Sequence, residues 1–178
     1  MCERRPDLLN IDTNCLEEIK DYIALDLDAN NKKLFKILEL IPPTLLVPQK
    51  QHLILENLTL WNGFCVKYNL NPINLLIEIP VVLMAEDFMM FEERFNDLRD
   101  YFAVKKDVST FIENMPSVLV DYWPTIKAKL DFVIHTMMVS PTTLSKTKVL
   151  QYDINHIKVK MAFSVRCCDF STSSFTKS

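Results

Sequence analysis

Apolar residues recur at every third or fourth position along most of the chain, which is the period of an α-helix with one buried face. Asn14, with Glu17 three residues further on, is predicted to cap the first helix. The apolar stripe of this helix consists of Leu16, Ile19, Tyr22 and Ile23. Further helices are predicted over residues 34–41, 49–68, 73–79, 87–102, 107–115, 124–138 and 141–146, with a last one from residue 153.

Three of these helices end at a proline that opens the pattern P-x-x-L, in "PPTL" (42–45), "PVVL" (80–83) and "PSVL" (116–119). Proline lacks the donor that continues a helix and disfavours α-helical backbone in the residue before it. Each segment is therefore predicted to form a short 3₁₀ turn. A degenerate fourth copy, "TKVL" (147–150), has Thr147 in place of proline. The leucines that close the four copies are predicted to be buried: Leu45, Leu83, Leu119 and Leu150.

These stops are spaced like a structural repeat. Pro42, Pro80, Pro116 and Thr147 are separated by 38, 36 and 31 residues, a range that is typical of stacked helical units. We therefore predict an all-α fold, a helical-repeat solenoid with units of about 30–38 residues. Each unit contains a long helix, a short helix and a proline-stopped 3₁₀ turn. The predicted organisation is a helical cap at 1–30, repeats over 31–165, and a disordered, Ser/Thr-rich tail at 166–178.

The composition supports helices and excludes several other folds. The 178 residues include Gly 1, whereas β-sandwiches need glycine in tight turns and Rossmann sites need it beside phosphates. No run of 18 apolar residues occurs, so no membrane-spanning helix is predicted. The five cysteines contain no C-x-x-C motif, which indicates reduced thiols in place of a zinc or disulfide framework.

The charge of the chain is unevenly distributed. Residues 1–90 have 8 basic and 13 acidic side chains, and residues 91–178 have 12 and 10, although the whole chain has a net charge of −3. The basic excess is greatest over 122–168, with seven basic and two acidic residues. Lysines that neutralise phosphates supply most non-specific affinity for nucleic acid. The candidate nucleic-acid-binding residues are Lys127, Lys129, Lys146, Lys148, Lys158, Lys160 and Arg166.

These six lysines form three pairs with one residue between the two members. Side chains two positions apart on a helix point about 200° apart, so one member of each pair is expected to join a common stripe. The alternative interpretation is an ordinary solvated helix surface, on which the lysines bind no ligand.

The other polar and aromatic residues indicate no catalytic, metal or cofactor site, so we predict that the protein is not an enzyme. No phosphate-binding loop, nucleophile elbow or zinc motif occurs. The histidines have no carboxylate or cysteine at ligand spacing, and are expected to be structural: His52, His135 and His156. Four aromatic residues could stack on unpaired bases, but their apolar helical setting favours core packing: Trp61, Trp123, Tyr101 and Phe102.

The segment "MMVSPTTLSKTKVLQYDINHIKVK" (137–160) resembles the closing repeat of the mitochondrial transcription termination factor (mTERF) family. Residues 138–141 match the start of that repeat, and its end is matched by Leu150, Tyr152, Ile154 and Ile157. The segments "LLIEIPVVL" (75–83) and "FIENMPSVL" (111–119) are similar to the internal stops of the family. The resemblance covers roughly residues 30–165. It implies a left-handed solenoid with two α-helices and a short 3₁₀ helix per repeat, which binds nucleic acid along a basic inner face.

The same resemblance implies a regulator of mitochondrial gene expression that binds double-stranded DNA or RNA. Such a protein would act in transcription termination or regulation, or in mitoribosome biogenesis. One alternative is a scaffold of the same fold that binds a protein through its acidic N-terminal half, and another is a shortened family member with little activity. The mitochondrial location follows from the resemblance alone. The N-terminal sequence has no clear transit peptide, and a cytoplasmic location is the alternative.

Overall fold

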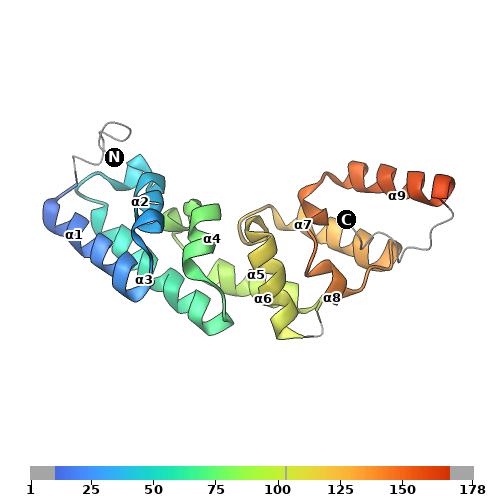
Figure 1. The fold of residues 1–178 in the computed structure, drawn as a ribbon, viewed down its shortest axis with the longest axis horizontal. Coiled ribbons are helices and arrows are strands. Elements are labelled where there is room, and N and C mark those ends of the chain that lie inside the picture. The colour runs from blue at the N-terminus through green and yellow to red at the C-terminus, as the bar shows by residue number, and fades with distance from the viewer. Residues whose placement is uncertain (1–10, 103, 169–178) are drawn as a thin grey trace. The chain divides into compact units, whose positions relative to one another are not determined.

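The computed structural model describes residues 11–102 and 104–168, with side chains up to residue 162, and all the elements in these ranges are helices (Figure 1). The predicted all-α fold is therefore confirmed for the described part of the chain. The chain divides into two compact units, Met1–Glu92 and Glu93–Ser178. Among the described helices, none is both long enough and apolar enough to cross a lipid bilayer.

The first unit begins with α1 (Thr13–Asp21), a π-helical turn η2 (Tyr22–Asp26), α2 (Asn31–Leu40) and a 3₁₀ turn η3 (Pro43–Leu45). It continues with α3 (Gln51–Tyr68), α4 (Pro72–Glu78), a 3₁₀ turn η4 (Pro80–Met84) and the start of α5 (Met89–Arg99). Helix α1 packs on α3, and α2 packs on α4. The core of the unit surrounds Trp61, whose indole N–H donates to the carbonyl of Pro72 at 3.1 Å.

The second unit contains the rest of α5, then α6 (Lys105–Asn114), a 3₁₀ turn η5 (Pro116–Leu119) and α7 (Trp123–Asp131). A π-helical turn η6 (Phe132–Thr136) extends α7, and α8 (Pro141–Leu144), a 3₁₀ turn η7 (Val149–Gln151) and α9 (Ile154–Cys168) follow. Helix α6 packs on α8, and α7 packs on η7. Apolar side chains from these elements, such as Phe111, Leu130 and Val133, form its core.

The order of long helix, short helix and 3₁₀ turn occurs four times before α9. The four predicted turns are present as 3₁₀ helices, and the four leucines that close them are buried, as predicted. In three of the copies a side chain of the long helix donates to a carbonyl of the following turn: Asn57 to Leu83, Arg94 to Val118 and Lys129 to Leu150. Because a 3₁₀ turn leaves carbonyls without helical partners, these donors fix each turn on its long helix.

Several element boundaries differ from the sequence prediction. The N-cap of α1 is Asp12, whose side chain accepts from the backbone N–H groups of Asn14 and Cys15, so the prediction of Asn14 as the cap was wrong. The predicted helix over 124–138 consists of α7 and a π-helical turn, and the one over 141–146 is a single turn. Helix α9 includes residues 166–168 of the predicted tail, and 169–178 lie outside the described residues.

The connection between long and short helix has the same backbone in three copies. Asp28, Asn69 and Met138 have positive φ values of 55°, 54° and 57°. Two residues after each of them an N-cap side chain accepts from a backbone N–H: Asn30 from Lys33, Asn71 from Asn74 and Ser140 from Thr143. Asp and Asn tolerate left-handed backbone, whereas methionine is strained there. The same turn therefore occurs at three of the four connections although its residue types differ.

Replacing Met138 by glycine is expected to raise the free energy of unfolding by about 0.5–1 kcal/mol. Relief of left-handed strain is worth about 1–2 kcal/mol, and the extra backbone entropy of glycine offsets about half of it. The Met138 side chain is 74% exposed, so its removal costs little packing. Chemical denaturation would measure the change, with Met138→Ala as the matched control, which keeps the strain and is expected to show no gain.

Candidate nucleic-acid interface

Three of the predicted lysines line one hollow of the second unit, with a volume of about 900 Å³. They are Lys146 and Lys148, from the segment between α8 and η7, and Lys160 on α9. Val133, Met137 and Ile157 are apolar residues in its lining. The described residues that line the hollow include no Asp or Glu, so the hollow combines positive charge with apolar surface.

The end of α8 brings Lys146 and Lys148 to the same hollow. Ser145 and Thr147 turn their hydroxyls back onto the carbonyls of Thr142 and Leu144, at 2.9 and 3.1 Å, and helical structure ends at this point. Side chains that bond back to nearby carbonyls compete with the helical pattern. Because residues 146 and 148 are not helical, the 200° separation expected on a helix does not apply, and both lysines line the hollow.

The other four predicted residues do not line this hollow. Lys129 donates to the carbonyl of Leu150 at 2.8 Å and has the turn-fixing role that Asn57 and Arg94 have in other copies. Lys158 places its ammonium 5.5 Å from the centre of the Phe132 ring. Lys127 is exposed on α7. Arg166 belongs to α9, and its side chain lies outside the described part.

A pair of aromatic rings lies beside the lysines in the same lining. The rings of Tyr152 and His156 stack with centroids 5.3 Å apart and an interplanar angle of 21°. The ammonium of Lys160 is 4.9 Å from the centre of the Tyr152 ring, within the range of a cation–π interaction. Tyr152 is half exposed, so the pair offers a flat aromatic surface next to positive charge.

This aromatic pair was not among the candidate binding residues predicted from the sequence. The sequence feature that could have indicated the pair is the spacing of four residues between Tyr152 and His156, inside the most basic stretch of the chain. His156 was predicted to be structural, and Tyr152 was interpreted only as a part of the repeat pattern. Their stacking depends on the backbone between η7 and α9, which the periodicity does not specify.

Of the four aromatic residues that were considered for base stacking, two lie in the core and two are partly exposed. Trp61 and Phe102 are buried, which confirms the prediction of core packing for these two. The Arg94 guanidinium lies 4.7 Å from the centre of the Trp123 ring. The Tyr101 ring packs edge-on against the Trp123 ring, with centroids 6.5 Å apart. The Tyr101 hydroxyl donates to Asp131 at 2.9 Å. Burial and this hydrogen bond together raise the pKa of Tyr101 to about 12.

One carboxylate approaches the hollow from α6. The Thr142 hydroxyl, which is part of the lining, donates to Asp107 at 2.8 Å. This bond joins α8 to α6 and orients the threonine. The neighbouring Thr143 also lines the hollow, and its hydroxyl accepts from Ser140 at 2.8 Å. The Thr142 proton is therefore already donated to Asp107, whereas the Thr143 hydroxyl accepts from Ser140 and keeps its own proton for a ligand oxygen.

No protein-family model matches the chain, and no curated protein matches it with significant similarity.

Proposed function

We propose that the protein binds nucleic acid through the hollow formed by Lys146, Lys148, Lys160, Tyr152 and His156. The observation that carries the proposal is the convergence of three lysines and a stacked aromatic pair on one apolar hollow. The lysines would neutralise backbone phosphates and release counterions, which gives affinity without sequence preference. The exposed aromatic pair would stack on an unpaired base, an interaction worth about 1–3 kcal/mol per base.

We further propose that the chain is a helical-repeat protein of the mTERF type that acts in mitochondrial gene expression. The support is the resemblance of residues 137–160 to the closing repeat of that family, together with the fourfold order of long helix, short helix and 3₁₀ turn. In such a protein the repeats would stack as a solenoid, and the basic hollow would lie on the face that meets the phosphate backbone. Termination or regulation of transcription and mitoribosome biogenesis are the two processes in which it would act.

Ultraviolet cross-linking tests the location of the interface. Random-sequence single-stranded RNA and duplex DNA, each irradiated with the full chain, are expected to cross-link to peptides from residues 141–160. Tyr152 and His156 are the expected attachment points because they present exposed rings. Lys146→Glu with Lys148→Glu should remove these cross-links. Cross-links confined to residues 11–92, with none on the basic hollow, would contradict the proposal.

A further inference from the structure

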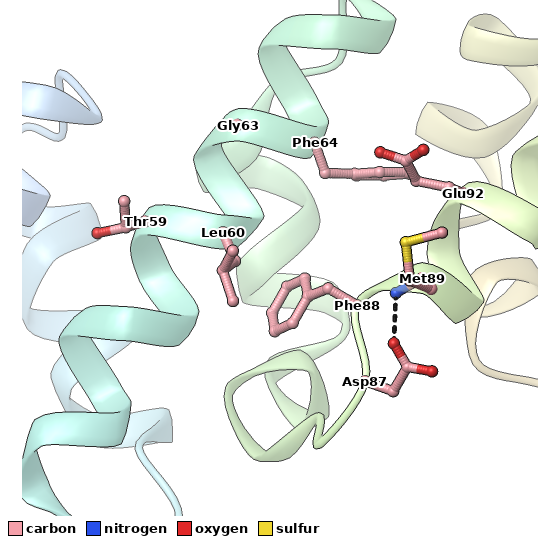
Figure 2. A pocket seen from close by; sticks show the side chains of 8 residues that line it. All are labelled: Thr59, Leu60, Gly63, Phe64, Asp87, Phe88, Met89 and Glu92. Atoms are coloured by element: carbon pink, nitrogen blue, oxygen red, sulfur yellow. Dashed lines mark hydrogen bonds between the residues drawn. The ribbon is translucent and has the colours of Figure 1, made fainter.

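A separate hollow lies on the first unit, with a volume of about 430 Å³ (Figure 2). Leu60, Gly63 and Phe64 of α3 line one side of it, and Phe88 and Met89 at the start of α5 line the other. Figure 2 shows the Leu60 side chain directed from α3 toward the ring of Phe88. These residues lie more than twenty positions apart in the sequence, and the turn η4 brings them together.

The surface around this hollow is apolar and exposed. Leu60 is 47% and Met89 is 59% exposed, and both line the hollow. Leu60 and Gly63 are three residues apart and are therefore neighbours on one side of α3. Methionine adapts its shape to a bound partner and is over-represented on such surfaces. Exposed apolar side chains that line one hollow are typical of a binding site.

Gly63 supports the same conclusion from the backbone. It is the only glycine of the chain and lies within the 18-residue helix α3, where glycine destabilises a helix relative to alanine. A Cβ atom at this position would meet nothing within 4 Å, and the φ of Gly63 is not positive. The described fold therefore gives no reason for a glycine here. A glycine in a helix face allows another backbone to approach closely.

The charge around the hollow is acidic. Asp87 and Glu92 belong to the lining, and Glu56 is exposed one turn before Leu60 on α3. Asp87 caps the start of α5 by accepting from the backbone N–H of Met89 at 2.8 Å. Glu92 is paired with Lys67 at 2.7 Å, which leaves the two remaining carboxylates as the net charge of the site. The surface therefore repels nucleic acid and attracts a basic partner.

We propose that this hollow docks an amphipathic helix of a protein partner, with basic residues flanking its apolar face. The apolar side chains of the partner helix would enter between Leu60 and Phe88, and its backbone would approach at Gly63. Its basic residues would lie beside Asp87 and Glu56. The hollow shares no lining residue with the basic hollow of the second unit.

A display library of randomised helical peptides, selected on the full chain, is the probe for this site. The enriched peptides are expected to have apolar residues at positions i, i+3 or i+4, and i+7, with Lys or Arg beside them. A Cβ atom at Gly63 meets nothing within 4 Å and leucine is a better helix former than glycine, so Gly63→Leu should fold. Its side chain should occupy the hollow and weaken peptide binding about tenfold or more. Lys36→Leu, at an exposed position of α2, is the control that introduces the same side chain and should bind as the unchanged protein does.

Three results would overturn the proposal. The first is equal enrichment of the same peptides on the unchanged chain and on the Gly63→Leu variant. The second is a set of selected peptides without a basic excess. The third is a dimer of this chain, detected by light scattering, that is dissociated by the Gly63→Leu substitution. A second copy of the chain, and not a partner helix, would then occupy the hollow.

Discussion

Replacing Leu119 by alanine is expected to lower the free energy of unfolding by about 2–5 kcal/mol. Leu119 closes the 3₁₀ turn η5 and is 0% exposed, so its removal leaves a cavity among packed neighbours. Small domains have a total stability of about 5–15 kcal/mol, so this single change removes a large part of it. Chemical denaturation followed by circular dichroism gives the value.

The matched control is Leu25→Ala, which removes the same atoms from a residue that is 78% exposed. Its expected effect is within about 0.5 kcal/mol, as for other surface substitutions. A loss below about 0.5 kcal/mol for Leu119→Ala would mean that the leucine of the P-x-x-L pattern does not anchor its repeat.

The sequence was sufficient to predict the helices and their stops because these depend on local chemistry. Proline is tolerated in the first turn of a helix but ends a helix that reaches it from the N-terminal side, and Pro80 and Pro116 begin 3₁₀ turns at the predicted places. The spacing of the stops then predicted which leucines are buried. Boundaries were less predictable where competing caps were close together, and Asp12 rather than Asn14 caps α1 because its carboxylate reaches two backbone N–H groups.

The candidate sites were less predictable because they depend on contacts that the helical period does not contain. Lys129 looked equivalent to the other lysines, but its ammonium bonds the Leu150 carbonyl across the fold. Lys146 and Lys148 share a hollow because α8 stops after a single turn. The hollow around Gly63 is lined by residues from α3 and α5. In the sequence, the single glycine only indicated a helical composition and gave no sign of a binding site.

Replacing Lys146, Lys148 and Lys160 together by alanine is expected to weaken nucleic-acid binding about 100-fold at ~0.15 M salt. Each phosphate contact contributes about 0.7–0.9 to the slope of log affinity against log salt, so the loss of three contacts flattens the slope by about two to three units. The reduction should be similar for all sequences, because phosphate contacts do not read bases.

The matched control replaces three exposed lysines of the first unit, Lys32, Lys36 and Lys50, and changes the net charge by the same amount. This variant is expected to retain most of the affinity, because the first unit has an acidic excess and its hollow beside Gly63 is lined by Asp87 and Glu92. An equal loss in both variants would mean that total charge, and not the hollow, determines the binding.

The most direct test of nucleic-acid binding is a titration of the full chain with single-stranded RNA and with duplex DNA at two salt concentrations. Between about 50 and 200 mM salt, three phosphate contacts predict that the affinity falls about 20- to 40-fold. Circular dichroism under the same conditions shows that the helices are intact. Absence of binding at low salt by the folded protein, or an affinity that does not change with salt, would contradict the account.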